Sequence, residues 1–331
     1  MKLKSPPSIF PPRGLGLLIR LYELVWHLLL PLVLGLFWKK GAKEPLYRAY
    51  LHERFGLVAR NSHHPIWIHS ASIGEMRGAA PWIKALLAQD FHLLITTLTP
   101  AGRTVAAQLF APQMQSGQLQ LSYAPLELSW AVRAFIRRAQ PRCAVMTEID
   151  TWPVLLATIR KAGLPLAMAN AQYPLASFER DQKWWGLRSR LFTAYQLVMC
   201  KSQMQADRFL KAGCANVAIV GETRFDLPIA THQVTRGQST LALDQLQTRP
   251  RVCFASAIEG EDELLIACML DMRKRFLAHQ MPAPLFVYVP RSPQRFNAVH
   301  ALIQSSGLTV ARRSDVLDKD LQWVNSPAWS E

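Results

Sequence analysis

The chain has 331 residues, of which 50% are hydrophobic, and a formal net charge of +15 at pH 7. This length and composition exclude an intrinsically disordered protein and allow two compact domains. The positive charge favours an anionic neighbour, such as a phosphorylated substrate or an anionic bilayer. The basic residues are scattered, and no RNA-binding aromatic motif or paired Cys/His finger is present, so we expect no nucleic acid partner.

The five cysteines and nine histidines give no sign of a metal site. No two cysteines form a Cys-x-x-Cys pair, and four of them lie in or beside apolar runs. They are typical of small core residues in a reducing compartment. Because the histidines are not spaced with cysteines in any ligand pattern, we expect no zinc site.

Residues 14–38 are mostly apolar and are interrupted only by Arg20, Glu23 and His27. Small residues for signal cleavage are missing at the exit, and basic residues flank the stretch, so we expect a retained membrane anchor with its basic flanks over residues 1–44. The anchor either spans obliquely or lies in the interface; the alternative is an amphipathic helix docked on a soluble domain. Because basic residues lead from the anchor into the rest of the chain, we expect the body on the cytoplasmic side of the membrane.

Apolar runs and helical patterns alternate after the anchor. The pattern predicts strands at 66–70, 93–98, 119–124, 144–148, 166–170, 197–201 and 217–220, with helices at 76–88, 102–109, 129–139, 152–162, 184–192 and 204–212. Continuous apolar strands separated by helices are typical of a parallel sheet that is covered on both faces. We therefore expect a doubly wound, Rossmann-like domain over residues 45–225.

A less regular stretch at 226–250 is predicted to be a linker, and a second series of strands and helices follows it at 251–331. This series has strands at 252–256, 285–289 and 309–313 and helices at 261–278 and 296–306. A complete nucleotide-binding doubly wound domain needs two such halves, so we expect a partial one.

The first strand ends in the sequence HSASIGEMRGAA, which places Glu75 at the start of a helix. Ligands of open α/β sheets bind at the carboxyl ends of the strands, so Glu75 either accepts a proton there or caps the helix. A serine hydrolase is not indicated, because Ser70 stands where the nucleophile elbow needs glycine. A dinucleotide-binding site is not indicated either, because no Gly-x-Gly-x-x-Gly fingerprint is present.

Three further strand ends carry polar side chains. The threonine-rich segment 96–99 either helps to hold a phosphate or supports the strand and the next helix. Glu148 and Asp150 either stabilise developing positive charge in a cleft, or Asp150 or Thr151 simply caps the following helix. Arg224 either faces the cleft between the two expected domains or forms an ion pair with Asp226.

In order along the chain, these segments resemble the 3-deoxy-D-manno-octulosonic acid (Kdo) transferases of lipopolysaccharide synthesis. The segments are LYRAYLHERFG, IHSASIGEMRGAA, TTLTPAGR, APLELSWAVRAFIRR, TEIDTWP, ANAQ, QADRFLKAG, GETRFD, ASAIEGEDE and YVPRSPQRF. The resemblance implies an α/β fold of the GT-B type with two Rossmann-like domains, the second incomplete here. It also implies an enzyme that is attached to the cytoplasmic side of the inner membrane and uses CMP-Kdo as donor and a lipid A precursor as acceptor, without a metal or other cofactor.

The resemblance also implies roles for individual residues. Glu75 matches the general base, and Glu148 and Arg224 match two transition-state stabilisers. Pro290 and Arg291 match a pair that binds the CMP of the donor. Direct displacement at the anomeric carbon of Kdo would invert its configuration.

The chain also departs from the family pattern. Arg224 stands where lysine is usual, Gln172 where arginine is usual, Ala257-Ile258 where Thr-His is usual and Ser292 where histidine is usual. The glycine-rich loop of the later donor-binding half is not found after residue 313, so we expect a C-terminally shortened member. Two alternatives stay open: an inactive, membrane-bound relative that binds only the lipid acceptor, and a related glycosyltransferase with another donor.

Overall fold

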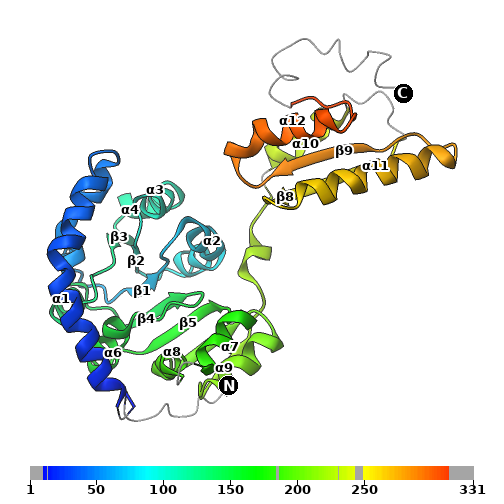
Figure 1. Ribbon diagram of the computed structural model, residues 1–331. Helices are drawn as coiled ribbons and strands as arrows, with labels where there is room; N and C mark the ends of the chain where they lie inside the picture. Colours follow the sequence, from blue (N-terminus) through cyan, green and yellow to red (C-terminus); the bar gives the residue numbers. More distant parts are fainter. Residues whose placement is uncertain (1–9, 13, 184–185, 230, 243–248, 313–331) are drawn as a thin grey trace. The chain divides into compact units, whose positions relative to one another are not determined.

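The computed structural model describes residues 10–12, 14–183, 186–229, 231–242 and 249–312. Its contacts divide the chain into two compact units, Met1–Leu227 and Pro228–Glu331, which we describe separately (Figure 1). The first unit contains every residue that the sequence pattern placed at the proposed base and stabiliser positions.

A parallel sheet of seven strands forms the centre of the first unit, in the order β3-β2-β1-β4-β5-β6-β7. Its strands are β1 (Ile66–His69), β2 (Leu93–Thr97), β3 (Leu119–Tyr123), β4 (Cys143–Thr147), β5 (Leu166–Ala171), β6 (Leu197–Cys200) and β7 (Val217–Ile219). All of them lie within the predicted strand regions to within a residue or two, which confirms the α/β fold class. The strand order reverses next to β1, so the ends of β1 and β4 lie side by side.

Both faces of this sheet are buried, as the continuous apolar runs predict. Trp67 and Ile68 are neighbours in β1 and enter different hydrophobic clusters. Helices α2 (Ile73–Leu87) and α3 (Pro100–Leu109) cover the face that contains Ile68, whereas α5 (Ser129–Ala139) and α6 (Pro153–Lys161) belong to the cluster with Trp67. The strand ends are therefore held from two sides.

Shorter helices complete the first unit. These are η1 (Pro45–Tyr47), η2 (Leu51–Phe55), α4 (Ala111–Gln115), α7 (Leu175–Lys183), α8 (Leu187–Leu191), η3 (Phe192–Ala194), α9 (Gln203–Lys211) and η4 (Thr223–Asp226), where η is a 3-10 helix. The helix predicted at 184–192 corresponds to α8 and the first residue of η3, and its first two residues lie outside the described part of the chain.

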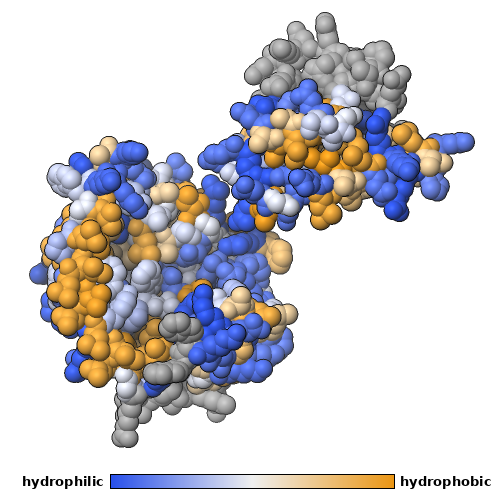
Figure 2. Space-filling view, viewed as in Figure 1, coloured by the Kyte–Doolittle hydropathy of each residue, from blue (hydrophilic) through white to orange (hydrophobic). Residues whose placement is uncertain are grey.

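The N-terminal apolar stretch forms one long helix, α1 (Leu15–Lys40). A stripe along its whole length packs on the first unit and consists of Leu15, Ile19, Tyr22, Trp26, Leu30 and Phe37. The opposite face is also apolar and is exposed, as Figure 2 shows, with Leu17, Leu21, Leu24, Leu28, Leu32 and Leu36. Among the described residues, α1 is the one helix long and apolar enough to cross a membrane.

The second unit contains two parallel strands, β8 (Arg251–Ala257) and β9 (Leu285–Pro290). Its helices are α10 (Thr231–Ala242), α11 (Asp262–Ala278), η5 (Pro293–Arg295) and α12 (Phe296–Ser305). Two expectations differ from this arrangement. Helix α10 lies inside the stretch predicted to be an irregular linker, and residues 309–312, predicted as strand, form none; residue 313 lies outside the described residues.

Candidate active site

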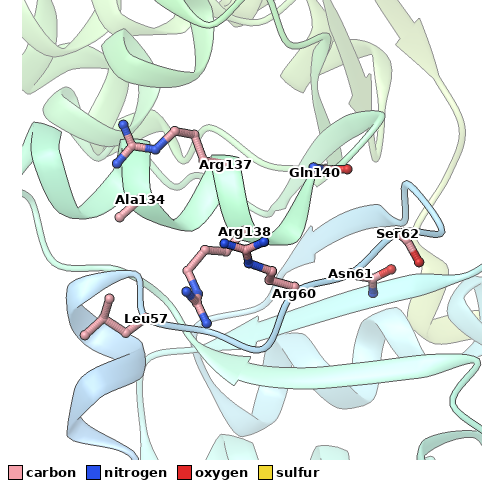
Figure 3. Close-up of a pocket in the computed structure, with 8 residues that line it drawn as sticks. All are labelled: Leu57, Arg60, Asn61, Ser62, Ala134, Arg137, Arg138 and Gln140. Atoms are coloured by element: carbon pink, nitrogen blue, oxygen red, sulfur yellow. The ribbon is translucent and has the colours of Figure 1, made fainter.

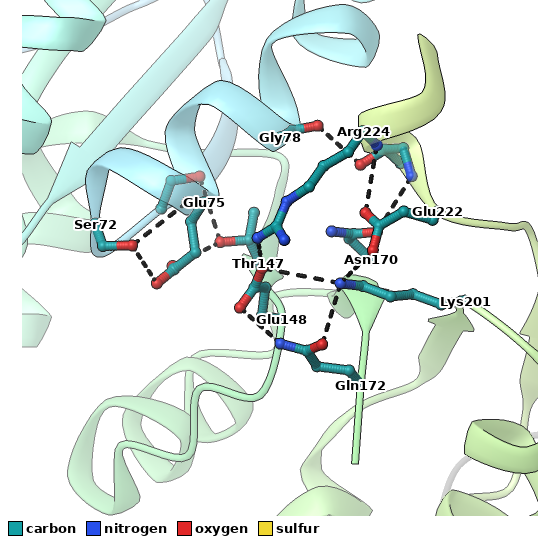
Figure 4. Close-up of polar contacts among 12 residues, drawn as sticks. Ser72, Glu75, Gly78, Thr147, Glu148, Asn170, Gln172, Lys201, Glu222 and Arg224 are labelled. Atoms are coloured by element: carbon teal, nitrogen blue, oxygen red, sulfur yellow. Dashed lines mark hydrogen bonds and ion pairs between the residues drawn. The ribbon is translucent and has the colours of Figure 1, made fainter. Parts of the chain in front are cut away.

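Two of the predicted acidic residues meet at the carboxyl edge of the first sheet. Glu75 lies in the first turn of α2, just after β1, and Glu148 directly follows β4. Because β1 and β4 are paired and parallel, their carboxyl ends bring both side chains to one place. Thr147, the last residue of β4, places its hydroxyl 3.0 Å from Oε2 of Glu75 (Figure 4).

Glu75 is held by a cap at the start of α2. Ser72 is the N-cap residue: its Oγ accepts from the Glu75 amide at 3.4 Å and donates to Glu75 Oε1 at 2.9 Å. The Ala71 amide donates to Oε2 at 2.7 Å. The capping role left open by the sequence is therefore observed. A carboxylate has about four acceptor positions, so even if Thr147 fills one, at least one position remains for a substrate hydroxyl, on Oε1 of a partly exposed side chain.

Glu148 lies in a network of opposite charges. Arg224 donates from a terminal guanidinium nitrogen to Glu148 Oε1 at 2.7 Å, and Gln172 donates to Oε2 at 2.9 Å. Lys201 Nζ lies 3.9 Å from Glu148 Oε1 and 2.7 Å from Glu222 Oε2. Arg224 thus pairs with Glu148 rather than with Asp226, the alternative partner considered from the sequence. The Glu148 backbone has φ 59°, in the left-handed region, which turns the chain sharply after β4.

The second acid of this strand end, Asp150, faces a different environment. Its Oδ2 is buried 3.4 Å from Nε2 of His69, a fully buried side chain whose Nδ1 contacts Thr96. Burial lowers the pKa of His69 to about 4. Burial, and then the negative charges of Glu75 and Glu148, raise the pKa of Asp150 to about 8. At neutral pH this pair is therefore uncharged, and it lies beside the carboxylates of Glu75 and Glu148 without adding to their charge.

Sequence reasoning missed several members of the network. Lys201 and Asn170 also stand at strand ends, after β6 and near the end of β5, and the Asn170 side chain accepts from the Thr223 amide at 3.3 Å. A polar residue directly after an apolar run was the signal that identified Glu148. The same signal would have found Lys201.

The predicted donor-binding pair belongs to the second unit. Pro290 is the last residue of β9, and the amide of exposed Arg291 donates to the Ala257 carbonyl at 2.9 Å. Both residues stand at the carboxyl end of a parallel strand, as a nucleotide site in such a sheet requires. Within the described residues, no group of three or more His, Cys, Asp or Glu side chains is arranged to hold a metal ion.

A basic surface pocket of about 600 Å³ lies at a different edge of the first unit, where α5 ends and the chain approaches β1 (Figure 3). Its lining is Leu57, Arg60, Asn61, Ser62, Ala134, Arg137, Arg138 and Gln140. Arg138 donates to the Val58 carbonyl, and basic residues in the last turn of a helix are the usual partners of its negative end. The pocket residues Ser62 and Gln140 come before β1 and β4, whereas Glu75 and Glu148 come after these strands, so the pocket is separate from the carboxylate site.

A doubly wound sheet with a polar carboxyl edge, followed by a second parallel α/β unit, defines a protein with the GT-B type of glycosyltransferase architecture. Two solved structures share the fold at a TM-score of 0.50 each. One is a putative UDP-N-acetylglucosamine 2-epimerase from Listeria monocytogenes, with 11% identity over 73% of this chain and 66% of that chain. The other is the UDP-GlcNAc 2-epimerase of Neisseria meningitidis, with 12% identity over 80% and 75%.

Sequence comparison gives the family. Residues 49–227 match the family model described as 3-deoxy-D-manno-octulosonic-acid transferase (kdotransferase). The Kdo transferase of Bordetella pertussis is 31% identical over 300 residues, which are 88% of this chain and 68% of the relative. That of Haemophilus influenzae is 29% identical over 291 residues, or 86% and 66%. The chain belongs to the Kdo transferase family of glycosyltransferases, and it spans about two thirds of the length of these relatives.

Proposed function

We propose that the chain transfers Kdo from CMP-Kdo to a lipid A precursor in lipopolysaccharide synthesis, with inversion and without a metal. The observation that carries this proposal is the family match over residues 49–227, because it covers both carboxylates that meet at the carboxyl edge. The excess of positive charge fits a phosphorylated lipid acceptor and an anionic membrane.

In the proposed reaction, Glu75 takes the proton of the acceptor hydroxyl as its oxygen attacks the anomeric carbon of Kdo. The bond from that carbon to the phosphate of CMP breaks, and its electron pair leaves with CMP. Glu148 stabilises the positive charge that develops on the sugar, and Arg224 offsets the charge of the leaving phosphate. Pro290 and Arg291 hold the CMP group.

The direct test is transfer of labelled Kdo from CMP-Kdo to a lipid A precursor by membranes that contain the full chain. We expect Glu75→Gln to lower turnover at least ~100-fold, the usual range for loss of a general base. Glu179→Gln, which changes an exposed glutamate on α7, is the matched control and keeps wild-type turnover. Equal turnover by wild type and Glu75→Gln would remove Glu75 from this role.

A second variant separates the two roles of Glu75. Ser72→Ala removes the hydroxyl that caps α2 but leaves the carboxylate in place. We expect a lower melting temperature with most of the turnover retained, because loss of a cap costs about 1 kcal/mol. A loss of turnover as large as that of Glu75→Gln would show that transfer needs the Ser72–Glu75 contact and not the carboxylate alone. Wild type that binds the lipid but transfers nothing would favour the acceptor-binding alternative, and transfer from another sugar nucleotide the alternative donor.

We further propose that α1 attaches the chain to the cytoplasmic side of the inner membrane by lying flat in the interface. The packed stripe of α1 contacts the first unit along its length, and Glu23 Oε1 accepts from the Ser129 amide at 2.6 Å. Crossing the bilayer would break these contacts and place Glu23 in hydrocarbon, which is costly. A flat helix keeps them and buries only its exposed leucine face.

Reporter fusions test this arrangement. A fluorescent protein that folds only in the cytoplasm is fused before Met1 in one version and after Glu331 in another, and alkaline phosphatase, active only in the periplasm, is fused at the same places. A flat α1 gives fluorescence and no phosphatase activity at both positions. Phosphatase activity at the N-terminus together with fluorescence at the C-terminus would show that α1 spans the membrane.

A further inference from the structure

Glu148 has two cationic neighbours that differ in exposure. The Arg224 side chain is 46% exposed and reaches Glu148 from η4, the last element of the first unit. The Lys201 side chain is only 11% exposed and approaches from the end of β6. The Glu148 side chain itself is 15% exposed. An ionised carboxylate with so little access to water needs a lasting counter-charge.

Lys201 is fixed at this place by two neighbours. Its Nζ lies 2.7 Å from Glu222 Oε2 and donates to Gln172 Oε1 at 3.2 Å (Figure 4). The same Gln172 donates its amide N–H to Glu148 Oε2 at 2.9 Å. Gln172 therefore links the lysine to the carboxylate: it holds Oε2 of Glu148 by a hydrogen bond, and the Lys201 charge lies 3.9 Å from Oε1.

The geometry points to Lys201 as a positioning residue that stays with Glu148 when Arg224 turns to the leaving phosphate. This inference rests on the proposed function, and it adds a residue to which neither the family match nor the sequence motifs gave a role. Arg224 alone cannot fully serve a carboxylate and a departing phosphate together. With Lys201 and Gln172 in place, Glu148 keeps a counter-charge and its orientation while the exposed guanidinium is free to act.

The position of the cation also bears on a departure noted in the sequence. Gln172 stands where the family pattern has arginine, so this chain has no guanidinium at the end of β5. Lys201, in direct contact with Gln172, brings one positive charge to the same carboxylate from the next strand. A cation at either position 172 or position 201 would then be sufficient.

Four variants of the full chain test the proposal by Kdo transfer. Lys201→Gln removes the charge, Lys201→Arg keeps it, and Lys201→Gln with Gln172→Arg moves it to the neighbouring strand. Lys211→Gln changes an exposed lysine at the end of α9 and is the control. We expect kcat of Lys201→Gln to fall ~10- to 100-fold with little change in the acceptor KM, and both charge-retaining variants to recover most of it.

The pH profile separates positioning from a merely structural role. Without the neighbouring cation the protonated carboxyl is favoured, so the acidic limb of kcat moves to higher pH in Lys201→Gln and returns in the double variant. A lower melting temperature with unchanged kcat and pH profile would overturn the proposal. Wild type without transfer activity would instead count against the proposed function.

If the wild type shows no transfer activity, a measurement that does not depend on turnover still tests the proposal. Carbon-13 NMR follows the Glu148 carboxyl, assigned by the signal that disappears in Glu148→Gln. We expect the chemical shift of this signal at neutral pH to change in Lys201→Gln and to return towards the wild-type value in the double variant. The same chemical shift in all three would overturn the proposal.

Discussion

At the scale of single residues, Glu148 and Asp150 show that a sequence can predict a residue's place at a strand end but not the environment of its side chain. Their place at a strand end was predictable from the apolar run before them. Their separation into two environments was not, because it depends on the left-handed backbone of Glu148, which sends one carboxylate to Arg224 and the other to His69. Neither partner is close to them in the sequence.

The buried Asp150 predicts a dependence of stability on pH. In the unfolded chain its carboxyl loses its proton near pH 3.8, whereas in the folded chain it keeps the proton up to about pH 8. Between these values the folded state binds the additional proton, so the contribution of Asp150 to the free energy of unfolding falls as pH rises. We expect Asp150→Asn to remove this fall.

Denaturant unfolding of wild type and Asp150→Asn across the pH range checks this prediction. The free energy of unfolding of the variant minus that of wild type should increase from about pH 4 to about pH 8. The slope should be at most ~1.4 kcal/mol per pH unit, the value for one proton. A difference that is constant over this range would mean that Asp150 is ionised in the folded chain.

At the scale of elements, strong patterns predicted the structure and weak ones did not. The seven strands of the first sheet were found because short, continuous apolar runs between helical patterns are typical of buried strands. Helix α7 was missed because its sequence, LASFERDQK, is mostly polar. The apolar residues predicted as a strand at 309–312 include Val310, which packs with Leu308 against the cluster of α12 instead of pairing with a strand.

The contact between η2 and α5 depends on Gly56. This residue has φ +77°, and a Cβ there would lie 2.1 Å from the Ala131 carbonyl oxygen. Gly117 has the same φ but nothing within 4 Å, so it separates backbone strain from steric overlap. We expect Gly117→Ala to cost about 1–2 kcal/mol and Gly56→Ala a further ~1–3 kcal/mol.

Thermal unfolding of both glycine variants beside wild type measures this difference. The melting temperature should decrease in the order wild type, Gly117→Ala, Gly56→Ala. Equal melting temperatures for the two variants would show that η2 moves away from α5 without loss of free energy.

At the scale of the whole molecule, the two units differ in how much core they contain. Among the residues that the structure describes, three hydrophobic clusters are built only from the first unit, whereas the second unit contributes one small cluster around Ile266, Val299 and Ile303. The sequence indicated this difference, because seven apolar strand runs precede residue 227 and few follow it.

We therefore expect residues 1–227 to fold without the second unit. In detergent micelles, which cover the exposed face of α1, the amide NMR signals of this fragment should superimpose on those of the same residues in the full chain. A fragment with collapsed signal dispersion would show that the first unit depends on residues after Leu227.

The segment that carries Arg224 is also the exit of the first unit. Thr223 donates to the Gly78 carbonyl at 2.8 Å, Arg224 holds Glu148, and the boundary follows at Leu227. A pulling force on Pro228 therefore acts first on η4, the short helix that Arg224 links to the Glu148 carboxylate. Tension along the chain would displace the Arg224 guanidinium before it moved any strand of the sheet.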